Sequence, residues 1–265
     1  MKIATWNVNS VRARLGVLDA WLDEVRPDVL LLQETKCLEE AFPYGFFEGK
    51  GYSCQVLGQK SYNGVAVVSR LSMEDRVAGL PTFPEDTAAR YLEVLVGGRI
   101  RVVSLYVPNG GSEVGGGPYQ YKMTFLERFQ DHLNTLQTYN EAIFIGGDFN
   151  IAPTDDDVYD ESLWHDCVCC TREERDVLQQ MRKAGWRDLL GEAWEAKHPG
   201  TKKPFTWWDY RMQAFARNRG LRLDLFLGNA LAREFCQSIQ VDSKVRGRPT
   251  PSDHAPVILE IADLM

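Results

Sequence analysis

The stretch that most constrains the fold is Ala142–Asn150, A-I-F-I-G-G-D-F-N. Its first four residues are small, β-branched or aromatic, which predicts a buried strand. Gly146 and Gly147 follow, and glycines there allow a turn or a close approach to the backbone. Asp148 and Asn150 are two residues apart, so in extended backbone their side chains point to the same side. The stretch therefore predicts a carboxylate and a carboxamide that face one spot beyond a rigid strand.

This pair of side chains has two interpretations. Asp148 can take a proton or orient a water molecule, and Asn150 can donate to a charged oxygen, which suits chemistry on a phosphate. The alternative is an ordinary surface turn, because Asp and Asn are common at strand ends for structural reasons. The residues at the ends of the other strands are needed to choose between the two.

The composition predicts a packed globular protein. Of its 265 residues, 44% are hydrophobic and 25% are charged, which argues against disorder. No apolar run approaches the length that spans a membrane, and the chain starts directly with a strand pattern, M-K-I-A-T-W-N, so we expect no secretory signal. The six cysteines lack a paired spacing, so we expect reduced thiols in a cytoplasmic protein.

The formal charge of −7 argues against a general coat of nucleic acid and against a basic tail, but it permits a local DNA-binding surface. An acidic centre that holds a divalent metal ion would account for part of the negative balance. Basic residues do cluster late in the chain, at Lys202 and Lys203, at Arg217, Arg219 and Arg222, and at Lys244, Arg246 and Arg248.

The hydrophobic patterns predict many strands in hairpins, with a few helices between them. We expect strands within residues 2–9, 28–32, 51–57, 64–69, 91–96, 100–107, 142–148, 221–227 and 257–261. We expect helices at residues 11–25, 119–138, 171–183 and 186–193, the third opened by a capping box of Thr171 and Glu174. This order predicts one domain over residues 1–265, a four-layered α/β sandwich in which two packed, mostly antiparallel β-sheets are flanked by helices.

Six separate elements end in groups that bind metal ions or handle protons. These groups are Asn7, Glu34, Tyr106, Asp148 with Asn150, Asp224, and Asp253 with His254. Carboxylate and amide oxygens suit a hard cation such as Mg²⁺ or Mn²⁺, and the lack of cysteine in the set argues against zinc. We expect the six elements to meet at one rim of the sheets, where rigid strand ends preorganise a site.

Seven motifs run in order along nearly the whole chain. They are W-N-V-N at 6–9, L-L-Q-E-T-K at 31–36, Y-V-P-N-G at 106–110, G-D-F-N-I-A-P at 147–153, T-W-W-D-Y-R at 206–211, N-R-G-L-R-L-D at 218–224 and S-D-H-A-P at 252–256. In this set the chain resembles the exonuclease III / AP endonuclease family, within the endonuclease–exonuclease–phosphatase superfamily. G-D-F-N and S-D-H are shared across that superfamily, whereas Y-V-P-N-G and N-R-G-L-R-L-D are narrower and point to DNA repair. The resemblance implies a DNase I-like fold.

The resemblance also implies a metal cofactor, Mg²⁺, with Mn²⁺ as a substitute. Glu34 looks like the principal ligand, with Asn7 and Asp253 beside it. The full implied set of metal-binding residues is Asn7, Glu34, Asp148, Asn150, Asp253 and His254.

The implied catalytic roles fall on five residues. Asp224 resembles the carboxylate that pairs with His254, fixes its tautomer and favours an imidazolium, which then hydrogen-bonds a phosphate oxygen. Asp148 looks like the residue that positions or deprotonates the attacking water, and Asn150 and Tyr106 resemble groups that stabilise the charged transition state. In a second scheme Asp148 protonates the leaving oxygen and the His254–Asp224 pair is the base. Both schemes stay open.

The resemblance places a pocket for a flipped abasic sugar at Trp207, Leu221 and Leu223, and an apolar slot of this kind excludes a base by its size. It also suggests phosphate contacts from Arg90, Asn109 and Lys122. Ser112 stands where some relatives carry a longer residue that inserts into the duplex, and Thr171 lies in the region that separates AP-cleaving members from those limited to 3′ ends.

We therefore expect a Mg²⁺-dependent DNA repair nuclease that hydrolyses the phosphodiester 5′ to abasic sites in duplex DNA, with 3′–5′ exonuclease and 3′-phosphatase activity. Its partner would be double-stranded DNA with abasic sites or 3′ ends, and we expect a monomer with no membrane contact. The first alternative is a 3′-end-processing enzyme without AP endonuclease activity. A non-catalytic DNA-damage binder and a lipid or inositol phosphodiesterase are further alternatives, and the aromatic patch P-F-T-W-W-D-Y at 204–210 argues against the last.

Overall fold

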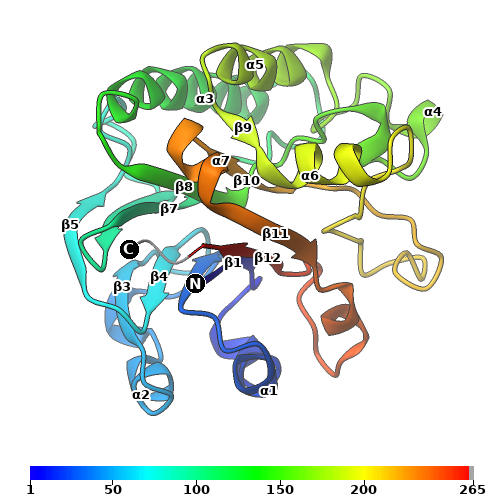
Figure 1. The fold of residues 1–265 in the computed structure, drawn as a ribbon. Coiled ribbons are helices and arrows are strands. Elements are labelled where there is room, and N and C mark those ends of the chain that lie inside the picture. Colours follow the sequence, from blue (N-terminus) through cyan, green and yellow to red (C-terminus); the bar gives the residue numbers. More distant parts are fainter. Residues whose placement is uncertain (263–265) are drawn as a thin grey trace.

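Two six-stranded sheets form the centre of the computed structural model, which describes residues 1–262 (Figure 1). The first sheet has the strand order β11 (Cys236–Val241), β12 (Val257–Ile261), β1 (Lys2–Asn7), β2 (Val29–Gln33), β4 (Val65–Ser69) and β3 (Ser53–Leu57). The second has the order β5 (Met73–Ala78), β6 (Tyr91–Val96), β7 (Ile100–Tyr106), β8 (Ala142–Asp148), β10 (Asp224–Gly228) and β9 (Arg187–Asp188). In the described chain, β1 and β2 pair in parallel, as do β7 and β8, and the other pairs are antiparallel.

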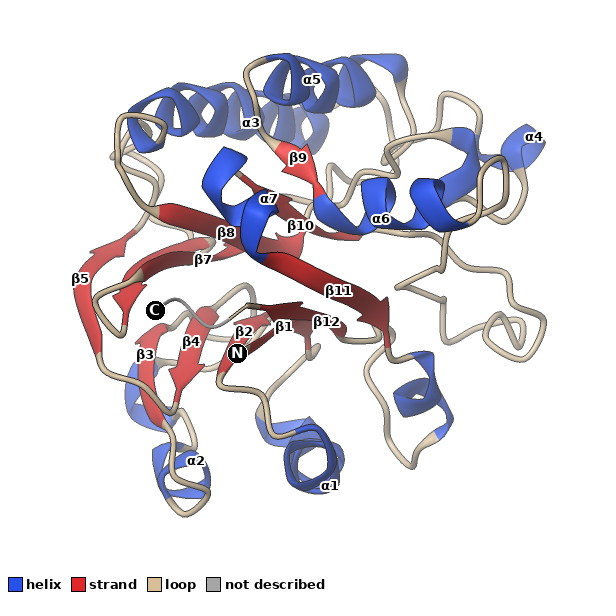
Figure 2. Cartoon of the chain, in the orientation of Figure 1, coloured by secondary structure: helices blue, strands red, loops and turns tan. Residues whose placement is uncertain are grey.

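Helices cover the outer faces of both sheets, as Figure 2 shows. The first sheet packs against α1 (Leu15–Val25) and α2 (Tyr44–Glu48), and the second against α3 (Gly117–Leu136) and α5 (Arg172–Lys183). Three further α-helices lie in the described residues: α4 (Glu161–Trp164), α6 (Leu189–Lys197) and α7 (Ala230–Phe235). The predicted four-layered α/β sandwich is therefore confirmed.

Strand β8 shows why its sequence is apolar at successive positions. Phe144 points into the core between the two sheets, whereas Ile143 and Ile145 point into the core beneath the outer helices. A strand that is covered on both faces needs apolar side chains on both, so it does not alternate with polar residues.

The two glycines of β8 are required by close packing within the strand and not by a turn. A Cβ on Gly147 would lie 1.9 Å from the carbonyl oxygen of Leu105 on β7. A Cβ on Gly146 would lie 2.7 Å from the ring of Phe226 and 2.8 Å from Leu31 of the opposite sheet. Both positions therefore need glycine, because neighbouring groups pack directly against the backbone of β8.

Some predicted boundaries were wrong, and some elements were missed. The predicted strand at 221–227 begins only at Asp224, because Leu221 forms isolated bridges to Trp207 and Val158. The sequence patterns missed β5 and β11, which lie at the two edges of the sheets and carry many polar residues. Edge strands often have such compositions, which leave no apolar period to recognise. The capping box of Thr171 and Glu174 is confirmed at the start of α5. Within the described part of the chain, no helix combines the length and apolarity needed to cross a membrane.

Candidate active site

The polar strand ends meet at one rim of the sandwich. In the first sheet Asn7 at the end of β1 is paired with Gln33, so Glu34 follows directly beside it. In the second sheet Tyr106, Asp148 and Asp224 lie in one row across β7, β8 and β10. The register of hydrogen bonds in each sheet therefore delivers these side chains to the same edge.

Asn7 joins the two sheets at this rim. Its side-chain nitrogen donates to Glu34 Oε1 at 2.9 Å and to Asp148 Oδ2 at 2.9 Å. The side chain of Asn7 is fully buried, so these bonds fix the separation of the two carboxylates. One amide thus sets the width of the site.

His254 lies between two carboxylates at the centre of the rim. Its Nδ1 is 2.8 Å from Asp224 Oδ2, and its Nε2 is 3.6 Å from Asp148 Oδ2. Glu34, Asp148 and His254 each offer a ligand atom, and these three atoms lie within 4.8 Å of one another. The structure thus brings together residues that are far apart in the sequence, as predicted.

The backbone at two of these residues is in the left-handed region. Glu34 has φ 50° and Asn150 has φ 51°, and non-glycine residues adopt such angles where the surrounding structure holds them. The amide N–H of Asn150 donates to Asp148 Oδ1 at 2.9 Å, and its side chain donates to the Val107 carbonyl at 3.0 Å. The Asx turn offered as an alternative is therefore present, and it holds Asp148 and Asn150 side by side at the rim.

The electrostatics of the site favour a protonated histidine. Burial alone would lower the pKa of His254, but the carboxylates of Asp224 and Asp148 outweigh it and raise the pKa to about 10. Burial raises the pKa of Asp148 to about 7, with Asp224 and Glu34 adding to this and His254 opposing it. An imidazolium does not coordinate a cation, so of the two roles predicted for His254 this environment favours hydrogen bonding.

Tyr106 remains a donor in this environment. Burial raises the pKa of its hydroxyl well above the ordinary value, and the charges of Glu34 and Asp148 act in the same direction. The guanidinium of Arg90 lies 4.8 Å from the centre of the Tyr106 ring and holds it against the rim.

The donor set fits a hard divalent cation. When Asp148 is ionised, the four carboxylates of Glu34, Asp148, Asp224 and Asp253 outnumber the nearest cations, which are the His254 imidazolium and one ammonium. That ammonium belongs to Lys36, and its Nζ lies 2.7 Å from Glu34 Oε2 and 2.5 Å from Asn9 Oδ1. A site with this excess of negative charge attracts cations, and its ligand atoms are oxygens, which suit Mg²⁺ or Mn²⁺.

The predicted ligand Asp253 lies at the border of the site and outside the group of three close ligand atoms. Its Oδ1 accepts from Asn9 at 2.9 Å and its Oδ2 from the Trp207 indole at 3.1 Å. Burial would raise its pKa, but the charge of His254 and these hydrogen bonds lower it, so it is ionised. Its role as a ligand stays a prediction.

Sequence reasoning missed Asn9 and Lys36, which both lie at the rim. Asn9 stands two residues after Asn7, the same spacing that singled out Asp148 and Asn150, so the spacing could have revealed it. Lys36 is close to Glu34 only because both residues have positive φ angles, and no sequence pattern signals that.

The residues predicted for an abasic pocket lie together. Leu221 and Leu223 are buried in one apolar cluster with Ala152, Val158 and Cys170, and the half-buried Trp207 packs on it. Trp207 also forms a bridge with His254, which places this cluster beside the rim. The assignment of this apolar cluster to an abasic pocket stays a prediction.

The predicted phosphate contacts differ in their positions. Asn109 is exposed in the loop after β7, and Arg90 is half-buried beside Tyr106. Lys122, in contrast, is fully buried and forms an ion pair with Glu174. A side chain with no exposed atom does not reach a DNA phosphate, so the structure corrects the prediction for Lys122.

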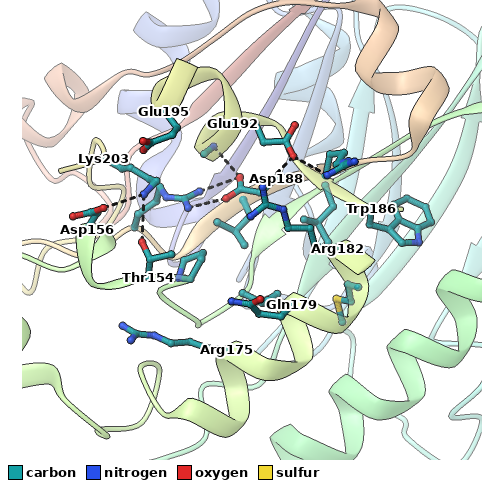
Figure 3. A pocket seen from close by; sticks show the side chains of 18 of the residues that line it. Thr154, Asp156, Arg175, Gln179, Arg182, Trp186, Asp188, Glu192, Glu195 and Lys203 are labelled. Atoms are coloured by element: carbon teal, nitrogen blue, oxygen red, sulfur yellow. Dashed lines mark hydrogen bonds and ion pairs between the residues drawn. The ribbon is translucent and has the colours of Figure 1, made fainter. Parts of the chain in front are cut away.

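A cavity of about 650 Å³ lies elsewhere, on the outer face of the second sheet between α5 and α6 (Figure 3). Leu225 and Leu227 of β10 line it, and they point away from the face to which Asp224 and Phe226 belong. None of the predicted catalytic or metal-binding residues lines this cavity. Its cations are paired with carboxylates, for example Arg222 with Asp188 at 2.7 Å. The cavity is therefore separate from the rim.

Known proteins share the motifs and the fold described above. A model of the endonuclease/exonuclease/phosphatase family matches residues 4–254. The chain belongs to this family. It is 32% identical over 269 residues to exodeoxyribonuclease III of Haemophilus influenzae, which covers 98% of this chain and 99% of that protein. It is 30% identical over 269 residues to DNA repair nuclease APEX1 of Danio rerio, over 99% of this chain and 82% of that protein.

Solved structures of other family members have the same architecture. The 3′ phosphatase NExo from Neisseria, bound to a product DNA hairpin, is 36% identical with a TM-score of 0.93, over 99% of this chain and all (100%) of that one. An AP endonuclease from Archaeoglobus fulgidus is 34% identical with a TM-score of 0.92, over 99% and 100% of the two chains. The predicted exonuclease III / AP endonuclease resemblance is confirmed, and this family member is a nuclease, a hydrolase.

Proposed function

We propose that the protein is a Mg²⁺-dependent DNA repair nuclease. It hydrolyses the phosphodiester 5′ to abasic sites in duplex DNA, trims 3′ ends as a 3′–5′ exonuclease and removes 3′ phosphates. The observation that carries this proposal is the meeting of Glu34, Asp148 and His254 at one rim, with Asp224 behind the histidine. The related proteins include an exodeoxyribonuclease III and an AP endonuclease, and this supports the choice of DNA as substrate.

The metal site that we propose is formed by oxygens of the rim. Glu34 is its principal ligand, Asn7 and Asp253 lie beside it, and Asp148 and Asn150 face the same space. When bound, Mg²⁺ would neutralise charge on the scissile phosphate and on the departing 3′ oxygen. Mn²⁺ has the same preference for oxygen ligands and would substitute for it.

The side chains divide the remaining work. Asp148 orients the attacking water and accepts its proton, since its raised pKa brings it near neutrality. Asn150 and Tyr106 donate to the oxygens that gain charge in the transition state. His254, kept as an imidazolium by Asp224, donates to a phosphate oxygen. In the second scheme Asp148 gives a proton to the leaving oxygen and the His254–Asp224 pair takes the proton of the water.

The apolar cluster sets the specificity for abasic sites. Leu221, Leu223 and Trp207 form a wall beside His254 that accepts a bare deoxyribose. A nucleotide with a base must bring a large planar group against this wall, so damaged sites without a base are favoured. Arg90 and Asn109 hold the backbone of the DNA near the rim.

Product analysis on an abasic duplex tests the proposal. The purified protein is incubated with end-labelled duplexes that carry either an abasic analogue or a 3′ phosphate, with Mg²⁺ and then with a chelator. We expect incision on the 5′ side of the abasic site and loss of the 3′ phosphate, both abolished by the chelator and restored by added Mg²⁺. Cleavage that persists without a divalent cation would overturn the metal assignment.

A second candidate is an enzyme that processes 3′ ends and does not cleave at abasic sites. It is favoured by the likeness to the Neisseria 3′ phosphatase, at 36% identity, and to a 3′–5′ exonuclease from Neisseria meningitidis, also at 36%. The same assay separates the two candidates, because this one leaves the abasic strand intact and still removes the 3′ phosphate.

We also propose that the protein acts as a monomer in the cytoplasm. All six cysteines are free in the structure, which suits a reducing compartment. Size-exclusion chromatography with light scattering measures the oligomeric state, and a mass twice that of the 30.1 kDa chain would contradict the proposal.

A further inference from the structure

A fully buried ion pair lies directly behind the catalytic loop. Lys122 of α3 and Glu174 of α5 are both 0% exposed, and the ammonium of Lys122 contacts the carboxylate of Glu174. The same ammonium donates to the backbone carbonyl of Asn150 at 2.7 Å. The pair therefore connects two outer helices to the loop that follows β8.

Glu174 holds a second segment at the same time. Its Oε1 accepts the amide N–H of Cys169 at 3.1 Å, and its Oε2 accepts the amide N–H of Thr171 at 2.9 Å. The carbonyl of Cys169 in turn accepts the N–H of Ala152 at 2.8 Å. A closed ring of interactions thus runs from Asn150 through Lys122, Glu174 and Cys169 back to Ala152.

This ring leaves the Asn150 backbone little freedom. Its N–H is bonded to Asp148, and its carbonyl is bonded to Lys122. Its φ of 51° lies in the left-handed region, which asparagine tolerates better than most residues, and those two bonds hold the backbone in it. The backbone of Asn150 is therefore held from behind by an ion pair that has no exposed atom, while its side chain donates to the Val107 carbonyl at 3.0 Å.

Stability alone does not account for the pair. Two charges removed from water cost several kcal/mol each, and well-packed apolar residues in place of a buried ion pair are often neutral or stabilising. A cation with several directed donors does what an apolar side chain does not, because it fixes the orientation of a carbonyl and a carboxylate together. The chemistry of the pair thus suits positioning.

We infer that Lys122 and Glu174 are positioning residues for the nuclease reaction, which act through Asn150 and touch no substrate. This inference rests on the proposed function, because it assigns the pair a role in that reaction. Their loss lowers turnover and leaves substrate binding intact. A small misplacement of a catalytic group costs about 10²-fold in rate, so the effect is large enough to measure.

The main variant is the double substitution Lys122→Met with Glu174→Gln, which removes both charges and avoids an uncompensated buried ion. We expect its kcat on duplex DNA to fall by about 30-fold or more and its KM to stay within about threefold, with a folded state by circular dichroism. The single substitution Glu174→Gln is a second variant with the same expected direction.

The matched control is Glu93→Gln. Glu93 on β6 is 1% exposed and pairs with the buried Arg101 at 2.8 Å, and Arg101 also pairs with Glu141 at 2.6 Å, so the loss of Glu93 tests a buried carboxylate of an ion-pair network away from the rim. We expect Glu93→Gln to lose thermal stability about as Glu174→Gln does, with kcat within about twofold of the wild type. A similar fall in kcat for both variants would mean a general structural effect and would overturn the inference.

Hydrogen exchange gives a readout that needs no activity. In the double variant we expect faster amide exchange at residues 149–152 and 167–171 than in the wild type, and no change in β6. If the wild type cleaves none of the DNA substrates, the proposed function fails. Even then, amide exchange in the double variant that equals that of the wild type would show that the ring does not hold the Asn150 loop. If the wild type is active, a folded double variant with kcat within twofold of the wild type overturns the positioning role alone.

Discussion

Replacing Asp224 by asparagine tests the electrostatic design of the rim. Asp224 is fully buried, and its Oδ2 lies 2.8 Å from Nδ1 of His254. Asn has the same shape and keeps a hydrogen bond to the ring, so the substitution removes a charge and little else. The expected changes therefore follow from the charge of one carboxylate.

The size of the effect follows from the pKa of His254. The rise from 6.5 to about 10 corresponds to about 5 kcal/mol in favour of the imidazolium, at about 1.4 kcal/mol per pH unit. Asp224 and Asp148 share this effect, and a hydrogen bond to a charged group contributes about 1.5–3 kcal/mol. We therefore expect Asp224→Asn to lower kcat at neutral pH by roughly 10- to 10²-fold, with DNA binding retained.

The pH dependence identifies the role of the histidine. We expect the substitution to lower the pKa of His254 from about 10 toward neutrality. If His254 acts as an imidazolium, the activity of the variant falls as the pH rises through this lower pKa, whereas the wild type keeps its activity to higher pH. If the pair is the base, the activity falls on the acid side instead.

The same shift also affects stability. Since the pKa of His254 is higher in the folded than in the unfolded state, its contribution to stability is complete below about pH 6.5 and is lost as the pH rises toward 10. Urea unfolding of the metal-free proteins measures this effect. The free energy of unfolding of the variant should lie furthest below that of the wild type below about pH 6.5, and closest to it near pH 10.

Two measurements decide the matter. NMR titration of the His254 ring reports its pKa in both proteins, and steady-state kinetics from pH 5 to 10 report the rates. An unchanged ring pKa in the variant, or a kcat within twofold of wild type at pH 7, would refute the role assigned to Asp224.

Three further substitutions test other parts of the structure. Asp148→Asn should abolish most activity and yet stabilise the metal-free protein at pH 8, by on the order of 1–3 kcal/mol in urea unfolding. The reason is that a buried carboxylate with a pKa raised to about 7 destabilises the folded state increasingly from about pH 4 to 7. A stability gain at pH 8 that does not exceed the gain at pH 5 would contradict this. Leu223→Ala should enlarge the apolar slot and raise cleavage at intact nucleotides relative to abasic sites by about tenfold, and an unchanged ratio would exclude a steric filter at this wall. Gly147→Ala should lower the free energy of unfolding by about 3 kcal/mol or more, or prevent folding, because its Cβ would lie 1.9 Å from a backbone oxygen. A decrease below about 1 kcal/mol would disprove that constraint.

The sequence predicted the layers of the fold and the polar side chains that the structure brings together at the rim. Strands covered on both faces have long apolar runs, and their polar ends stand out against such runs, as at Asp148 and Glu34. The edge strands β5 and β11 have mixed compositions, so the same method missed them. Asn9 was missed although its two-residue spacing from Asn7 could have revealed it. Lys36 was missed because its position beside Glu34 depends on positive φ angles that no sequence pattern signals.

By itself the sequence determined what depends on near neighbours along the chain. The Asp148–Asn150 turn and the Thr171–Glu174 capping box are of this kind, because a few consecutive residues form all of their bonds. Only the tertiary structure decided which of these groups meet. Asn7 and Asp148 are 141 residues apart, and Lys122 is buried behind Asn150 and not on the surface that faces DNA. Sheet register and helix packing set such distances, and they are properties of the whole folded chain.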